Sequence, residues 1–188
     1  MNITQPNYIT IRLAQPQDRN RIFDIQRDAI QRLCSRDYSP EQIQGLLNDK
    51  HLDNWQGEDT KEIVLVAEIG ETIVGFSAYS RYWVNAVYVD PKYVRQGIGT
   101  QLLKAIESDA LSENINTLAV CASITAKPFY EGSGYQEFGE TYILSSTGIH
   151  IPCIRMQKWL SSTTEGEQPP SDFLTAICRF LQWILIGK

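Results

Sequence analysis

The alternation of hydrophobic and polar positions divides the N-terminal part of the chain into a strand, two helices and a loop. Residues 8–13 alternate and predict a strand. Apolar residues then recur at helical spacing after Pro16 as far as Leu33, and proline is well tolerated in a first helical turn. A second helix is predicted from Ser39, a capping residue followed by a proline and by a glutamine that can reach back. Residues 49–60 are polar and predict a loop.

The remainder of the chain predicts mostly strands. β-Branched and aromatic residues form three consecutive runs, and a fourth, short apolar run is typical of a strand buried on both faces. The predicted strands are residues 62–69, 72–81, 83–90 and 117–122, followed by two more after Tyr135, of which the last covers about 150–158. Helices are predicted from residue 97 to about 111 and from about 125 to 131.

Composition narrows the class of protein. With 188 residues and 43% apolar content, residues 1–160 are expected to form one domain. The net charge of −5 and the absence of a basic stripe argue against nucleic acid as a partner. Four scattered cysteines and two histidines suggest neither a metal site nor a disulfide framework. The N-terminus has no signal-peptide pattern, so we expect a cytoplasmic protein.

The C-terminal end differs in composition from the domain. Residues 161–171 are typical of a linker, and residues 172–188 predict a hydrophobic helix with a narrow polar stripe that includes Arg179. This helix is short for a membrane span. We expect it to dock on protein, either its own domain or a second chain in a homodimer. Binding to a membrane surface is the less favoured alternative, because the helix lacks a basic polar face.

One stretch combines a strand, a glycine loop and a helix. The strand ends at Pro91, Gly97 and Gly99 follow, and apolar residues at helical spacing come next. The N-terminus of a helix has unpaired N–H groups and partial positive charge, and glycines let an anion approach the backbone. Leu102 stands where a dinucleotide fingerprint needs its third glycine, and no Gly-Lys-Ser/Thr follows. The loop is therefore either a phosphate cradle of another kind or a tight turn without a ligand.

This stretch resembles the acetyl-CoA-binding segment of the GCN5-related N-acetyltransferases (GNATs). The matching sequence is Val-Tyr-Val-Asp-Pro-x-Tyr-x-x-x-Gly-Ile-Gly-Thr-x-Leu-Leu, residues 87–103. The family pattern Arg/Gln-x-x-Gly-x-Gly/Ala is met at both glycines, whereas Val94 stands at the Arg/Gln position and the arginine is displaced to Arg95. A second segment, residues 123–135, resembles the family's Asn-x-x-Ala-x-x-Phe-Tyr-x-x-x-Gly-Phe/Tyr, with Ser123 in place of asparagine.

The resemblance, which runs from Ile9 to about Trp159, implies the fold and the cofactor. The implied fold is mixed α/β (α+β): a mostly antiparallel sheet of about seven strands with helices on both faces. The implied cosubstrate is acetyl-CoA, and no metal is needed. The residues that the resemblance places at the cofactor are Val87, Tyr88, Val89, Arg95, Gln96, Gly97, Ile98, Gly99, Thr100, Ser123, Ala126 and Phe129.

Tyr130 matches the tyrosine that acts as general acid in the family. Attack of an amine on a thioester releases a thiolate, and a phenol with a pKa of about 10 remains protonated at neutral pH to donate to it. An amide of the central strand, expected to be that of Val87, would polarise the carbonyl.

The general base remains open. The central-strand positions are Trp83 and Asn85, and neither can take a proton. Asn85 is included among the catalytic candidates because a water chain could end on it or on Ser123. The nearby ionisable residues are Asp28, Glu68, Tyr79 and Tyr82.

The expected function is acetyl-CoA-dependent N-acetylation of a small molecule or a peptide amine by direct transfer. Two alternatives stay open. One is acetylation of protein lysines or N-termini, and the other is a non-catalytic acyl-CoA-binding module.

Overall fold

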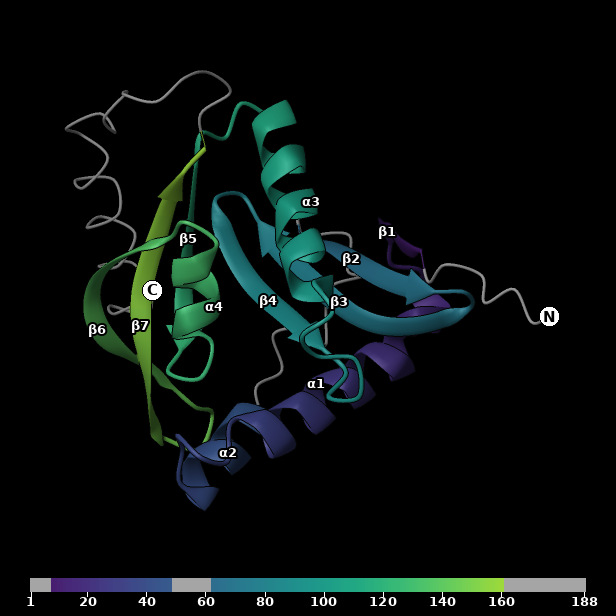
Figure 1. Cartoon of the computed structure of the whole chain (residues 1–188). Helices are drawn as coiled ribbons and strands as arrows, with labels where there is room; N and C mark the ends of the chain where they lie inside the picture. Colours follow the sequence, from purple (N-terminus) through teal and green to yellow (C-terminus); the bar gives the residue numbers. More distant parts are fainter. Residues whose placement is uncertain (1–7, 49–61, 161–188) are drawn as a thin grey trace.

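The computed structural model describes residues 8–48 and 62–160, which form a seven-stranded sheet with helices on both faces, as predicted (Figure 1). The strands are β1 (Ile9–Leu13), β2 (Glu62–Ile69), β3 (Thr72–Ser80), β4 (Trp83–Val89), β5 (Thr117–Ser123), β6 (Gln136–Leu144) and β7 (His150–Trp159). The helices are α1 (Arg19–Leu33), α2 (Pro40–Leu47), α3 (Ile98–Ser112) and α4 (Lys127–Gly132), and a 3₁₀ turn, η1 (Pro16–Asp18), precedes α1. The predicted loop at 49–60, the linker at 161–171 and the helix at 172–188 lie outside the described residues.

The sheet has the order β1-β2-β3-β4-β5-β7-β6, and every neighbouring pair is antiparallel except β4 and β5. These two strands are parallel and are connected by α3. They pair only at Trp83 with Ala119 and at Val84 with Val120. Both strands continue beyond these pairs, and Figure 1 shows them diverging toward their C-terminal ends. The sheet is therefore split in its centre.

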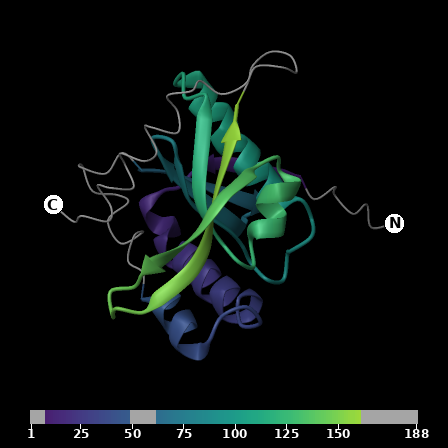
Figure 2. The same ribbon diagram turned by 90° about the vertical axis from the view of Figure 1, so that its left-hand side faces the viewer.

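The two faces of the sheet carry separate hydrophobic cores. On one face, α3 buries Ile98, Leu102, Leu103, Ile106 and Ala110 against the sheet, and the same core includes Tyr130 of α4. On the other face, Ile22 and Ile25 of α1 pack on Phe76, Ala78 and Ala86. A third, smaller cluster joins the end of α1 and α2 to Ile151 of β7. Figure 2 shows the same layers from the side.

Strand β4 contains one residue more than its partner. Ala78 of β3 pairs with Ala86, while the next residue, Tyr79, pairs with Val84, so Asn85 is left over as a β-bulge. The bulge changes the facing of the strand: Val84 belongs to the α3 core, whereas Ala86 belongs to the α1 core. A bulge bends its strand, and this one lies at the point where β4 leaves β5.

Local capping follows the sequence prediction at α2. The amide of Gln42 donates to the Ser39 hydroxyl oxygen (3.3 Å), and the Ser39 amide donates to the Gln42 side chain (3.0 Å). Among the described helices, none is both long and apolar enough to cross a membrane.

Candidate active site

A cavity of about 1610 Å³ occupies the split between β4 and β5 and is lined from both faces of the sheet. The predicted site residues that line it are Asn85, Val87, Tyr88, Val89, Arg95, Gly97, Ile98, Gly99, Thr100, Ser123, Ala126, Phe129 and Tyr130. Gln96 is not part of the lining. Residues far apart in sequence thus meet at one opening in the sheet.

The glycine loop forms one end of the cavity. Arg95 and Gly97 have positive φ angles of 63° and 78°, and Gly97 is the residue that precedes α3. No side chain of the described residues caps this end of the helix, and no acidic residue stands in its first turn. A Cβ placed on Gly97 would meet no atom within 4 Å. The first amides of α3 therefore border open space and can donate to an anion.

A partly buried ion pair supports the turn that leads into this loop. Arg21 of α1 lies 2.5 Å from the Asp90 carboxylate and also donates to the Ile73 carbonyl (3.0 Å). Burial opposes the charge on Asp90, but the hydrogen bond from the Lys92 amide and the Arg21 guanidinium hold its pKa below the usual range. The Tyr93 amide donates to the Asp90 carbonyl at 2.8 Å. Strand β4 is thereby joined to α1 at the point where the glycine loop begins.

The exposed edge of β4 presents backbone donors to the split. The Asp90 amide donates to the Val74 carbonyl (2.9 Å), which fixes the alternation of hydrogen bonds between β3 and β4. Positions in an antiparallel pair alternate between bonded and non-bonded, so Val87, opposite Ser77, and Val89 do not donate to β3. Their N–H groups point toward β5, into the space that β5 has vacated.

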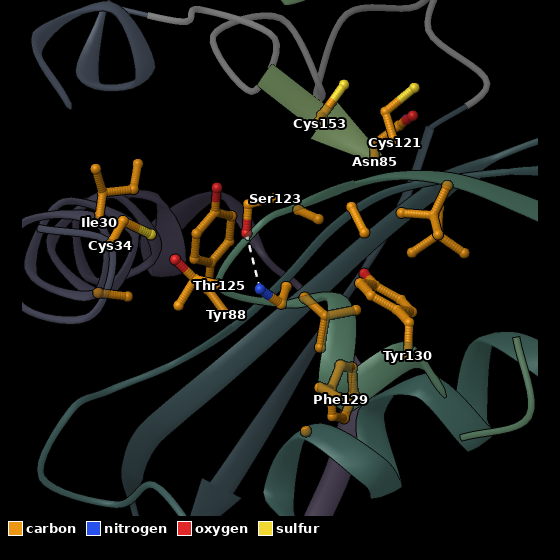
Figure 3. A pocket seen from close by; sticks show the side chains of 18 of the residues that line it. Ile30, Cys34, Asn85, Tyr88, Cys121, Ser123, Thr125, Phe129, Tyr130 and Cys153 are labelled. Carbon is orange, nitrogen blue, oxygen red and sulfur yellow. Dashed lines mark hydrogen bonds between the residues drawn. The ribbon is translucent and has the colours of Figure 1, made fainter. Parts of the chain in front are cut away.

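Tyr130 stands on the opposite wall. The residue is 4% exposed, and its ring makes edge contacts with the rings of Phe129 and Tyr135. The distances between ring centroids are 5.0 Å and 5.3 Å. Figure 3 shows its hydroxyl directed into the cavity, and within the described residues this hydroxyl has no hydrogen-bond partner. Burial, and to a lesser extent the neighbouring Tyr88, raise the pKa of Tyr130 well above that of a free tyrosine. The phenol is therefore a proton donor throughout the neutral range.

The start of α4 orients this tyrosine. The Ala126 amide donates to the Ser123 hydroxyl oxygen at 3.1 Å, the bond drawn in Figure 3. Ser123 therefore supplies an oxygen where the GNAT pattern has asparagine. A Cβ on Gly99 would lie 3.4 Å from the Phe129 ring, so the glycine lets α3 approach α4 closely.

A polar cluster lies on the other side of the split. The Asn85 side-chain amide donates to a Glu62 carboxylate oxygen (2.6 Å) and to the Ser80 hydroxyl oxygen (3.2 Å). All three residues line the cavity, and Glu62 is the only carboxylate among the described residues that do so. Sequence reasoning missed Glu62, because its strand reaches the site only through the pairing of Glu62 with Ser80 on β3.

The base candidates chosen from the sequence do not reach the cavity. Tyr79 is buried in the core and donates to Asp109, and Glu68 lies 2.5 Å from Arg12. Neither these two nor Asp28 or Tyr82 is part of the lining.

Among the described residues, three thiols also line the cavity, those of Cys34, Cys121 and Cys153. A hydrogen bond from Cys153 and the charge of Arg155 lower the pKa of Cys121, and the same hydrogen bond raises the pKa of Cys153. Burial raises the pKa of Cys34. Tyr38 closes this side by donating to the Pro152 carbonyl (2.7 Å) and accepting from the Ile124 amide (2.8 Å).

Comparison with known proteins identifies the family. Residues 34–159 match the model of the acetyltransferase (GNAT) domain. An uncharacterized N-acetyltransferase of Escherichia coli K12, YafP, is 36% identical over 130 residues, which are 69% of this chain and 83% of YafP. The chain belongs to the GNAT family of acetyltransferases.

Solved structures agree with this assignment. A GCN5-related N-acetyltransferase from Rhodopseudomonas palustris is 25% identical with a TM-score of 0.75, over 80% of this GNAT chain and 95% of that one. The PaiA N-acetyltransferase of Thermoplasma acidophilum, solved in complex with coenzyme A, has the same fold at 18% identity. Its TM-score is 0.63, over 81% of this chain and 99% of PaiA.

The residues of this GNAT enzyme fit a coenzyme A thioester. The uncapped N-terminus of α3 suits a pyrophosphate, and the free edge of β4 suits the amides of the pantetheine arm, because both offer unpaired backbone donors. Within the described part of the chain, no group of three or more His, Cys, Asp or Glu side chains could hold a metal ion.

Proposed function

We propose that this enzyme transfers the acetyl group of acetyl-CoA directly to the amine of a small molecule or peptide, with Tyr130 as general acid. One observation carries the proposal. Tyr130, Val87 and Glu62 all line one cavity, at the opening between β4 and β5, and the Val87 amide points away from β3.

The donor is expected on the α3 side. The amides from Arg95 to Thr100 bind the pyrophosphate, and the outward backbone groups of Val89 and Val87 pair with the pantetheine arm as a further strand would. This arrangement directs the thioester toward the bulge at Asn85. The Val87 amide then donates to the carbonyl oxygen as it gains negative charge, an effect worth about 10²–10³-fold for one such donor.

Two side chains, those of Glu62 and Tyr130, transfer the protons. Glu62, held by Asn85, takes a proton from the ammonium group of the acceptor, directly or through a water molecule, so that the neutral amine can attack. The nitrogen forms a bond to the acyl carbon, the carbon–sulfur bond breaks, and the nitrogen releases its second proton to solvent to give the neutral amide. Tyr130 donates its proton to the leaving thiolate, a transfer that typically contributes about 10²–10⁴-fold. The raised pKa of Tyr130 keeps that proton in place until the thiolate forms.

The proposal is tested with the full-length chain, acetyl-CoA and a panel of amines that includes small amines, peptide N-termini and peptide lysines. Chromatography measures free coenzyme A, and mass spectrometry identifies the acetylated product. We expect product from at least one small amine or peptide amine. Acetyl-CoA binding by calorimetry without any release of coenzyme A above hydrolysis would instead support an acyl-CoA-binding module. Turnover confined to folded protein substrates would support the protein-acetyltransferase alternative.

A further inference from the structure

Arg155 is a cation on the wall of the cavity that none of the roles above uses. It is on β7, opposite Cys121 of β5. Its sequence neighbours Ile154 and Met156 are buried in the core on the α3 face. Because side chains alternate along a strand, Arg155 projects on the opposite face, toward α1 and α2, and away from the glycine loop.

Among the residues that the structure describes, the guanidinium group has no anionic partner. Its Nε is buried without a hydrogen bond, and no carboxylate within the described residues pairs with it. It lies over the Phe138 ring (5.4 Å), and its charge acts on the thiols of Cys121 and Cys153. Two other arginines differ in this respect: Arg12 and Arg21 each lie within 2.6 Å of a carboxylate. A partly buried cation without a counter-ion is costly unless a ligand supplies the charge.

The charged side chains that line the cavity lie in two separate places, one where we expect acetyl-CoA and one where we expect the amine acceptor. Among the described lining residues, the basic ones are Arg95 and Arg155, and the acidic one is Glu62. Arg95 is in the glycine loop, where we expect the pyrophosphate. Arg155 projects on the opposite face of the sheet, so we expect it to contact the acceptor and not the pyrophosphate. Glu62 reaches β4 through Asn85, and β7 is two strands beyond β4, so the two charges lie on opposite sides of the split.

We propose that Arg155 binds a carboxylate of the acceptor, whose amine lies at Glu62. The substrate class is then a small amine that also carries a carboxylate several bonds away from the nitrogen, such as an ω-amino acid or a short peptide. A guanidinium fork suits a carboxylate because it can donate two parallel hydrogen bonds. This inference rests on the proposed function, since it assigns the other end of the same acceptor.

The experiment compares matched pairs of compounds. Each pair consists of an ω-amino acid of four to eight carbons and its primary amide, which keeps the amine and removes the negative charge. Calorimetry measures the binding of both to the full-length enzyme saturated with coenzyme A, and kcat/KM is measured for both with acetyl-CoA. The variants are Arg155→Gln, Arg155→Lys and the control Arg27→Gln, which removes an exposed cation paired with Asp24 on α1.

We expect the wild-type enzyme and the control to prefer the carboxylate of the best pair by about 10- to 100-fold, the usual range for a charge-assisted hydrogen bond. Arg155→Gln should bring the ratio close to one without weakening the binding of the amide, and Arg155→Lys should keep part of the preference. Equal binding of both members by the wild-type enzyme, or a preference that persists in Arg155→Gln, would overturn the inference. Binding preference without turnover would support Arg155 while contradicting the proposed function, so the two failures are distinguishable.

Discussion

The side-chain amide of Asn85 lies 2.6 Å from the carboxylate of Glu62, and this contact joins the bulge of β4 to the first residue of β2 at the floor of the cavity. If Glu62 takes the proton of the amine, Glu62→Gln should lower kcat/KM at neutral pH by about 10²-fold or more. Glutamine has nearly the same size and can still accept from Asn85, so acetyl-CoA affinity should change little.

The matched control is Glu68→Gln, which removes a carboxylate that pairs with Arg12 outside the cavity. It should retain the wild-type rate constant. Equal losses in both variants would show that Glu62 acts through stability and not as a base.

Tyr130→Phe should reduce turnover by at least about tenfold while acetyl-CoA affinity stays constant. The phenylalanine ring keeps the packing with Phe129 and Tyr135, so thermal stability should fall little. The control is Tyr135→Phe, a buried tyrosine whose side chain does not line the cavity. Equal turnover of Tyr130→Phe and wild type, with chemistry rate-limiting, would exclude Tyr130 as the acid.

The pH dependence follows from the direction of the pKa shift at Tyr130. Burial raises this pKa above that of free tyrosine, so the proton is retained up to at least about pH 10. Ionisation of Tyr130 should therefore not lower the rate constant for the chemical step between pH 7 and pH 9. In this range the pH profiles of the wild type and of Tyr130→Phe should have the same shape. A decrease in this range that is absent from the variant would contradict the raised pKa.

Gly97→Ala should weaken coenzyme A binding by about tenfold or more. The added methyl group would project into the open space where we place the pyrophosphate. Gly97 has a positive φ, so the variant also carries conformational strain of about 1–2 kcal/mol. Gly70→Ala controls for that strain, because Gly70 has a φ of 61° and a similarly open surrounding in the turn between β2 and β3. Equal coenzyme A affinity of the two variants, by calorimetry, would show that the cradle is elsewhere.

The thiols of the cavity should differ in reactivity. The pKa of Cys121 is lowered and the pKa values of Cys34 and Cys153 are raised, and the thiolate is the reactive form. Iodoacetamide at pH 7 should therefore modify Cys121 first, as read from peptide masses. The rate at Cys121 should rise with pH and level off at a lower pH than the rates at the other two. In Arg155→Gln this profile should move to higher pH, because a positive charge has been removed.

The elements of the fold could be predicted from the sequence because each has a local signature. The strand bounds at β2, β3 and β4 and the cap of α2 follow from residues a few positions apart. The residues that we expect at acetyl-CoA could also be predicted from the sequence, because the glycine loop and the 123–135 segment are continuous motifs. The residues that we expect at the acceptor could not be predicted in this way. Glu62 and Arg155 reach the cavity only through the register of β2, β3, β5 and β7 and the bulge at Asn85, which no short motif encodes.

The bulge also shows how the opening in the sheet is maintained. If Asn85 were deleted from the chain, two residue pairs would become neighbours in an uninterrupted ladder between β3 and β4. These are the pair of Tyr79 with Val84 and the pair of Ala78 with Ala86. The shortened β4 would keep every later residue on its present face, and without the bend it would be free to run alongside β5. In such a protein we expect the two central strands to pair along the segment that now borders the cavity. We infer that the extra residue in β4 keeps the two central strands apart and the cavity between them open.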